Sequence, residues 1–266
     1  MEAWKAEMGE VSTSLLELRG LACYFGGLAA VNELNFSLKK GLRQGLIGPN
    51  GAGKTTVFNL ITGFISASSG SILFKGTDIT NLKPHEIARA GISRTYQTNR
   101  LFMHLSLLEN VLVASNMYNS VSFWSELVAN SRAQRDWQAQ RQSARDLLDW
   151  VGLAGKEVMA AETLSYRDQK LTGIALALAA KPSLLLLDEP SSGLNERETE
   201  EMAEVIERIN TERGVTVIII EHKMKFVMGL CSQVAVMDTG YLLTQGSPDE
   251  IASNPDVVRI YLGEAA

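Results

Sequence analysis

The sequence predicts an α/β fold with an antiparallel β region at its start and a helical region inserted into a parallel-sheet core. Three observations predict it. Two β-rich runs, 15–25 and 31–40, open the chain. Helix formers dominate from His104 to Ala180. Two short, nearly all-apolar runs, 182–190 and 214–222, are typical of parallel strands covered on both faces.

The remaining elements follow in order along the 266 residues. A turn at Gly26 and Gly27 separates the first two strands. The other predicted elements are a strand, glycine loop and helix at 45–64, a long helix within 122–153, a charged crossover helix at 195–213, a hairpin turning at Thr239 and Gly240, and a short helix introduced by Ser247 and Pro248.

Composition limits the class of protein. The chain is 45% hydrophobic and 21% charged, within the range of globular proteins. Its net charge of -5 gives no whole-chain basic field for binding nucleic acid, so no nucleic-acid partner is expected. Cys23 and Cys231 are expected to be buried or free thiols in a reducing compartment. Lys181 and Pro182 interrupt the most apolar stretch, 171–187, so we expect a soluble cytoplasmic protein.

Residues 48–55, GPNGAGKT, match the phosphate-binding loop pattern between a strand and a helix. Glycines let backbone N–H groups turn onto phosphate oxygens, and the following helix adds the positive end of its dipole. Lys54 is expected to neutralise the β- and γ-phosphates of ATP, and Thr55 to coordinate Mg²⁺. The residues expected to bind ATP here are Gly48, Pro49, Asn50, Gly51, Ala52, Gly53, Lys54, Thr55 and Thr56. The sequence thus predicts a P-loop NTPase core.

Polar residues follow both later apolar strands. Asp188 ends the run LLLLD and is expected to hold Mg²⁺, directly or through water. Glu189 comes next and is expected to polarise the attacking water. His222 follows the second strand, where it can hydrogen-bond the γ-phosphate; its alternative is a structural histidine. These three residues complete a predicted site for ATP hydrolysis.

An ordered set of motifs resembles the ATP-binding subunits of ABC transporters, over about 14–263. The set is GPNGAGKTT, the glutamine of SRTYQTNRLF, the signature-like LSYRDQK, LLLLDEP, SSGLN and IIIEH. The runs FGGLAAVNELNFSL and PDVVRIYLGEA further resemble the LivG branch, which energises import of branched-chain and other hydrophobic amino acids. The resemblance implies a single ABC-type domain at 14–263, an N-terminal extension at 1–13 and a helical subdomain at about 98–180.

The resemblance also implies roles for single residues. Phe25 resembles the aromatic residue that stacks on adenine, with a core phenylalanine as the alternative. Gln97 resembles the glutamine that contacts Mg²⁺ and the attacking water, and residues 98–102 are expected near the groove for the membrane subunit. Residues 192–195 resemble the loop that crosses to the partner ATPase, with Asn195 where many relatives carry aspartate.

The signature segment departs from the family pattern. Its expected nucleotide contacts are Ser165, Arg167, Asp168 and Gln169, and Arg167 stands where glycine is expected. A guanidinium does not fit the space that glycine leaves for the partner's γ-phosphate. Three interpretations stay open: a degenerate site that hydrolyses ATP slowly, an arginine finger that stabilises the transferring phosphoryl group, or a harmless substitution.

The resemblance implies an assembly at the cytoplasmic face of the inner membrane. The expected partners are a second ATPase, LivF-like or a copy of this chain, two membrane permease subunits and an extracytoplasmic substrate-binding protein. Alternatives are the ATPase of a urea-type importer or a lipopolysaccharide exporter, and a regulatory nucleotide-binding module with little turnover. An ABC ATPase of DNA repair or translation is a further class, but its usual fused second ATPase or coiled-coil insertion is absent from the sequence.

Overall fold

The computed structural model describes residues 14–95, 101–116 and 131–262, which divide into two compact units. The first unit combines the described residues up to Ile87 with those from Thr216 onward, and the second runs from Ala88 to Val215. The phosphate loop therefore belongs to the first unit, and the strand that ends at Asp188 belongs to the second.

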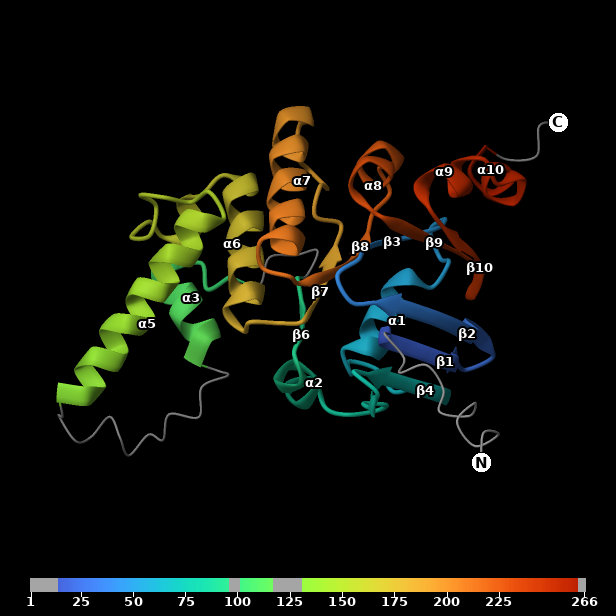
Figure 1. The fold of residues 1–266 in the computed structure, drawn as a ribbon, viewed down its shortest axis with the longest axis horizontal. Coiled ribbons are helices and arrows are strands. Elements are labelled where there is room, and N and C mark those ends of the chain that lie inside the picture. Colours follow the sequence, from blue (N-terminus) through green and yellow to red (C-terminus); the bar gives the residue numbers. More distant parts are fainter. Residues whose placement is uncertain (1–13, 96–100, 117–130, 263–266) are drawn as a thin grey trace, which may run out of the picture. The chain divides into compact units, whose positions relative to one another are not determined.

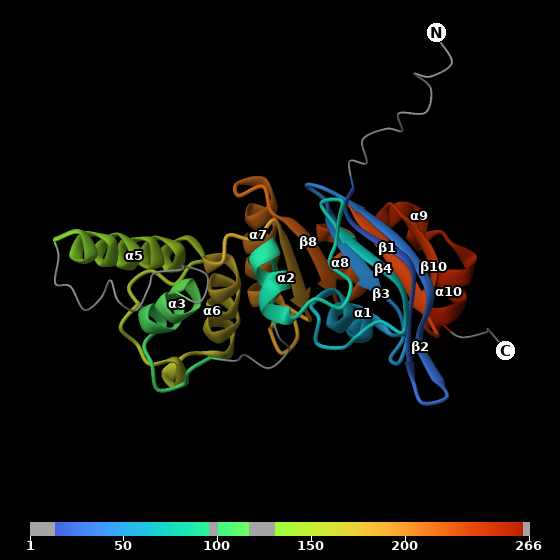
Figure 2. The same cartoon turned by 90° about the horizontal axis from the view of Figure 1, so that it is seen from below.

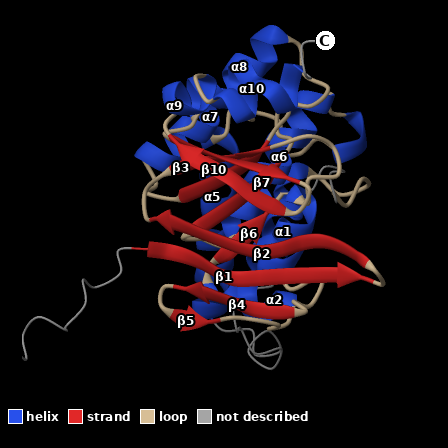
Figure 3. Cartoon of the chain, turned by 90° about the vertical axis from the view of Figure 1, so that its right-hand side faces the viewer, coloured by secondary structure: helices blue, strands red, loops and turns tan. Residues whose placement is uncertain are grey.

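The first unit contains the predicted antiparallel sheet, with strand order β2-β1-β4-β5 (Figure 3). Its strands are β1 (Ser14–Phe25), β2 (Leu28–Lys39), β4 (Ser69–Phe74) and β5 (Thr77–Asp78). Phe25 pairs with Leu28, so the β1–β2 turn lies at Gly26 and Gly27 as predicted. Gly26 has a positive φ of 59°, which glycine adopts without steric cost.

Four further strands of the first unit lie side by side in the order β10-β9-β3-β8. They are β3 (Arg43–Ile47), β8 (Thr216–Ile220), β9 (Gln233–Asp238) and β10 (Tyr241–Gly246). β3 is parallel to β8 and β9, and every residue of β8 is buried, as its apolar sequence predicts. β9 and β10 form the predicted hairpin, with positive φ at Thr239 and Gly240.

The helices of the first unit are short. They are α1 (Lys54–Ile61), α8 (Met224–Leu230), α9 (Pro248–Ala252) and α10 (Pro255–Leu262). Ser247 caps α9, and its hydroxyl accepts a hydrogen bond from the Glu250 N–H while Glu250 reaches back to the Ser247 N–H. This capping box confirms the helix start predicted at Ser247.

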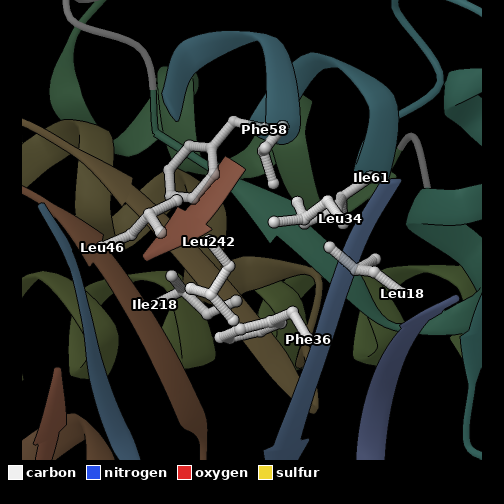
Figure 4. Close-up of a pocket in the computed structure, with 9 residues that line it drawn as sticks. Leu18, Leu34, Phe36, Leu46, Phe58, Ile61, Ile218 and Leu242 are labelled. Atoms are coloured by element: carbon white, nitrogen blue, oxygen red, sulfur yellow. The ribbon is translucent and has the colours of Figure 1, made fainter. Parts of the chain in front are cut away.

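The core of the first unit encloses a small apolar cavity of about 10 Å³ (Figure 4). Side chains of β1, β2, β3, α1, β8 and β10 surround it: Leu18, Leu34, Phe36, Leu46, Val57, Phe58, Ile61, Ile218 and Leu242. A space that holds at most about one water and offers it no polar partner stays dry. The cavity is therefore a packing gap rather than a ligand site.

The second unit combines helices with a pair of strands. Its elements are β6 (Ile92–Arg94), α3 (Leu107–Asn116), α5 (Ser131–Trp150), a 3-10 turn (Ala161–Thr163), α6 (Tyr166–Ala179), β7 (Leu184–Asp188) and α7 (Glu196–Thr211); α2 (Pro84–Ala90) spans the boundary. β6 is parallel to β7, whose residues are all buried. α3, α5 and α6 pack together (Figures 1 and 2).

The sequence located most of these elements correctly. α5 lies within the helix predicted at 122–153, although residues 117–130 lie outside the described part. α7 confirms the crossover helix, and Asn195 caps it through a capping box with Glu198. The helical subdomain at about 98–180 stays a prediction; α3, α5 and α6 fall inside that range. No helix among the described residues is long and apolar enough to cross a membrane.

Candidate functional site

The phosphate loop joins the end of β3 to the start of α1 in the first unit. A side chain at Gly48, where φ is 150°, would place its Cβ 2.1 Å from the Met237 carbonyl oxygen. At Gly53, where φ is 96°, a Cβ would lie 2.3 Å from the Ala30 carbonyl oxygen. Neither backbone oxygen can move without displacing its strand, so both positions require glycine. The loop approaches β2 and β9 closely, which explains why the phosphate-loop pattern has glycine at positions 48 and 53.

Lys54 is the first residue of α1, and its side chain is buried against the loop. Its Nζ donates hydrogen bonds to the carbonyl oxygens of Gly48, at 2.7 Å, and Pro49, at 2.9 Å. The ammonium group therefore lies inside the loop that precedes it. α1 begins without a side-chain cap or an acidic residue in its first turn. Its positive end is consequently not neutralised by its own residues, as anion binding requires.

Three other predicted residues lie in the same unit, and all three are exposed. The ring of Phe25 is 54% exposed at the end of β1. His222 is exposed directly after β8, and its backbone N–H donates to the Glu221 carboxylate. Thr55 is exposed on the first turn of α1. An exposed aromatic ring and an exposed hydroxyl are accessible for stacking and metal binding.

The C-terminal helix also reaches the phosphate loop. Tyr261 of α10 forms a hydrogen bond with the backbone of Gly48, the first residue of the loop. Burial raises the pKa of the Tyr261 phenol, and this hydrogen bond partly opposes the rise. No sequence motif predicts this contact, since Tyr261 lies outside every phosphate-binding motif.

In the second unit, Asp188 ends β7 beside Arg94, which ends β6. Arg94 Nη2 lies 2.7 Å from Asp188 Oδ2, and the two side chains are only 6% and 7% exposed. The Asp188 N–H points at the Thr95 hydroxyl at 3.4 Å. Arg94 was not among the predicted site residues. The feature that could have identified Arg94 is its position as a charged residue at the end of a strand that runs parallel to the Asp188 strand.

Glu189 is half-buried and has a positive φ of 48°, which is uncommon for a residue with a side chain. Its carbonyl oxygen accepts a hydrogen bond of 2.9 Å from Nζ of Lys170, a buried residue of α6. The signature helix and the backbone of the predicted general base are therefore directly linked. Lys170 was also absent from the predicted site.

The start of α6 shows how the signature segment is built. Ser165 is the N-cap and accepts a hydrogen bond from the Asp168 N–H. The Asp168 carboxylate is 7% exposed and pairs with Lys156, at 2.5 Å, as well as with Arg167. Gln169 donates to the Leu164 carbonyl oxygen at 3.3 Å. Ser165 is exposed, whereas Asp168 is occupied by contacts within the chain.

Arg167 is held by two carboxylates of its own unit. Its Nη1 lies 2.9 Å from Asp168 Oδ1, and its Nε lies 2.7 Å from Glu201 Oε2 of α7. The second contact is a close charge pair without hydrogen-bond alignment. Only 24% of the side chain is exposed. The guanidinium therefore connects the first turn of α6 to α7.

The predicted residues thus form two sets. Phe25, residues 48–56 and His222 lie in the first unit, whereas Ser165 to Gln169, Asp188 and Glu189 lie in the second. Gln97 and residues 98–100 lie outside the residues that the structure describes. Within the second unit, Lys170 brings the signature helix to Glu189, a relationship that no sequence motif contains.

Comparison with known proteins identifies the class. The family model of the ABC transporter matches residues 31–192, which include the phosphate loop and the Asp188 strand. The chain therefore belongs to the ABC transporter family, as one of its ATP-binding cassettes. It is an ATP-hydrolysing transporter subunit with the P-loop fold that the sequence predicts. The model of the branched-chain amino acid ATP-binding cassette transporter matches its end, residues 242–266.

Individual relatives show which branch of the ABC transporter family this chain is similar to. The chain is 40% identical over 255 residues to the high-affinity branched-chain amino acid transport ATP-binding protein BraF of Pseudomonas aeruginosa, covering 96% of this chain and 100% of BraF. The same values hold for LivG of Escherichia coli K12. Among solved structures, the ADP conformation of MJ1267, an ATP-binding cassette of an ABC transporter, matches with a TM-score of 0.82 and 30% identity. That match covers 95% of this chain and all of MJ1267.

The residues present fit a nucleotide and a magnesium ion. The cradle formed by Gly48 and Gly53, with the Lys54 ammonium inside it, suits phosphate oxygens. The Thr55 hydroxyl of the first unit and the Asp188 carboxylate of the second unit are each a hard oxygen donor of the kind that Mg²⁺ takes beside water and phosphate. The described residues contain no group of three or more His, Cys, Asp or Glu side chains that could hold a metal.

Proposed function

We propose that this chain is the ATPase subunit of an importer for branched-chain or other hydrophobic amino acids. The observation that carries the proposal is the full-length similarity to BraF and LivG, together with the intact phosphate loop and Asp188-Glu189 pair. The phosphate loop, Asp188, Glu189 and His222 are all present in this chain, which favours turnover over passive nucleotide binding.

Each site residue has a proposed role. Residues 48–56 bind the phosphates through backbone N–H groups, and Lys54 neutralises their charge. Glu189 takes the proton of the attacking water, and His222 hydrogen-bonds the γ-phosphate. Phe25 stacks on the adenine ring, for which its exposure is suited. Gln97 contacts Mg²⁺ and the attacking water in this proposal, and only its sequence motif supports that role.

Mg²⁺ neutralises the developing charge on the phosphates when it is bound. Thr55 and Asp188 of this chain would hold it, with Gln97 as the third proposed contact. Asp188 lies in an ion pair with Arg94, whose Nη2 is 2.7 Å from Asp188 Oδ2. Arg94 therefore orients the carboxylate of the proposed metal ligand.

An apolar surface supports attachment to a membrane subunit. Phe102, Met103, Val158 and Met159 are all exposed, and Val158 is 78% exposed. Backbone hydrogen bonds join the two segments, from Leu107 to Met159 and from Glu162 to Met103. Phe102 belongs to the stretch expected near the permease groove. We propose that this surface receives a permease subunit at the cytoplasmic face of the inner membrane, in a complex with a second ATPase and a substrate-binding protein.

Uptake by living cells tests the proposal. Cells that lack the gene are complemented with the original chain or with Lys54→Ala, and uptake of labelled leucine and of labelled urea is measured. We expect leucine uptake to return with the original chain only. Restoration of urea uptake instead would favour the urea-type alternative. Equal leucine uptake with and without the gene would reject the amino-acid importer.

The Arg167 contacts bear on the three interpretations of the signature segment. An arginine finger would have to leave Asp168 and Glu201 before it could reach a phosphate. If the Arg167 side chain stays with these carboxylates, position 167 still lacks the glycine that would let the backbone approach a phosphate closely. We therefore retain the degenerate site as the proposal: nucleotide that meets this segment is hydrolysed slowly, and a partner ATPase with a glycine signature supplies the faster site.

A further inference from the structure

A buried lysine, Lys170, contacts the backbone of the proposed general base, Glu189. Lys170 lies in the second turn of α6, and only 7% of it is exposed. Its Nζ donates a hydrogen bond of 2.9 Å to the Glu189 carbonyl oxygen. Lysine is rarely buried this deeply without a specific partner, because its ammonium group loses hydration. The Glu189 carbonyl is such a partner.

The accepting residue is held in an unfavourable conformation. Glu189 has a φ of 48°, in the left-handed region that side chains normally avoid. A residue in this conformation is strained and persists only where surrounding contacts fix it. This backbone conformation determines the direction in which the Glu189 side chain leaves the chain. Whatever fixes φ therefore also aims the carboxylate.

A second contact joins the same helix to the same loop. A Cβ at Gly193 would lie 2.6 Å from Cε1 of Tyr166, so the ring packs directly against the Gly193 backbone. The Lys170 ammonium lies 5.3 Å from the centroid of this ring, within cation–π range. Tyr166 and Lys170 are four residues apart on α6 and contact the two ends of the segment 189–193.

We propose that Lys170 is a positioning residue for hydrolysis: through the Glu189 carbonyl it fixes the backbone that aims the Glu189 carboxylate. Tyr166 supports it by packing over Gly193. The inference rests on the proposed role of Glu189 and adds a link within one chain, from the signature helix to that chain's own general base. A displacement of the first turns of α6 thereby changes the aim of Glu189.

The test compares three variants of the full-length chain in steady-state ATP hydrolysis. Lys170→Met keeps the length and packing of the side chain but removes the donor. Lys170→Arg keeps a charged donor. Thr172→Val is the matched control, because it deletes another buried hydrogen bond of α6, from the Thr172 hydroxyl to the Asp168 carbonyl, without touching 189–193.

We expect Lys170→Met to lower kcat at least tenfold with KM for ATP unchanged, since the nucleotide contacts are intact. Lys170→Arg should recover a large part of the rate, and Thr172→Val should keep the original kcat although it unfolds at a lower temperature. If Lys170→Met does not fold, Tyr166→Leu provides the test: Tyr166 is exposed, and its loss should lower kcat in the same direction.

An unchanged kcat in Lys170→Met would overturn the inference, as would equal losses in Lys170→Met and Thr172→Val. In the Tyr166→Leu arm, an unchanged kcat would do the same. A parallel Glu189→Gln variant separates this failure from failure of the proposed function. If Glu189→Gln is inactive while Lys170→Met is normal, only the positioning role is lost. If Glu189→Gln hydrolyses ATP normally, the role of Glu189 itself is wrong.

Discussion

The Arg94 guanidinium lies 2.7 Å from the Asp188 carboxylate at the ends of two parallel strands, with both side chains more than nine-tenths buried. Burial deprives both ions of most of their hydration, so the Asp188 carboxylate depends on its pair with Arg94. The pair places a charged carboxylate at the strand end where the phosphate chemistry is proposed. It also makes the end of β7 sensitive to the loss of one partner.

Replacing Arg94 is expected to destabilise the fold strongly. Arg94→Met leaves the Asp188 charge buried without its partner, which typically costs about 3–5 kcal/mol of unfolding free energy. Urea denaturation measures the loss. The control is Arg259→Met, which breaks the exposed Arg259–Asp256 pair and should cost less than about 1 kcal/mol. Equal losses in the two variants would contradict the account of the buried pair.

The interpretation of Arg167 predicts two different outcomes for two variants. Arg167→Gly should raise the steady-state ATPase rate of the isolated protein several-fold, because glycine lets the backbone approach a phosphate. Glu201→Gln should leave the rate unchanged, since it weakens the Arg167 contact with α7 and the exposed Arg197 pair but does not restore a glycine at position 167. Both rates are measured alone and with a second ATPase subunit that carries a glycine signature.

An arginine finger would reverse these results. Freeing the guanidinium with Glu201→Gln would then raise the rate, and Arg167→Gly would lower it. Equal rates in every combination would mean that Arg167 has no mechanistic role and is a harmless substitution.

Much of the fold could be predicted from the sequence, because its strands and helices carry strong local signals. The all-apolar runs became the buried strands β7 and β8, and Asn195 and Ser247 mark helix starts that their side chains cap. The glycine loop was recognisable because its backbone geometry requires glycine at Gly48 and Gly53.

The supporting contacts could not be predicted, because they depend on tertiary packing. Lys170 is a single lysine in a helix, and only the fold brings its ammonium to the Glu189 carbonyl 19 residues later. Arg94 reaches Asp188 through the pairing of β6 with β7. Arg167 was recognisable as a departure from the family pattern because glycine is expected at its position. Its carboxylate partners on α6 and α7 emerged only from the fold.

Cys231 is expected to resist alkylation in the folded protein. Burial raises the pKa of its thiol to about 12, so little reactive thiolate exists at pH 8. Because the folded-state pKa is raised from 9.0, folding favours the neutral thiol, and this contribution to stability declines as the pH rises from about 9 toward 12. In a Cys23→Ala variant, iodoacetamide at pH 8 should label Cys231 rapidly only after urea is added. Rapid labelling without urea would show an accessible thiol.

The most direct test of the account is the steady-state ATPase rate of Glu189→Gln beside that of the original chain, each assembled with its partner subunits. Nucleotide binding is measured in parallel, because the amide has nearly the size of the carboxylate and should leave the phosphate loop intact. We predict binding close to the original and a rate about 10²-fold lower or more, the scale expected for loss of a general base. Turnover near the original rate would contradict the assignment of Glu189 and, with it, the proposed site.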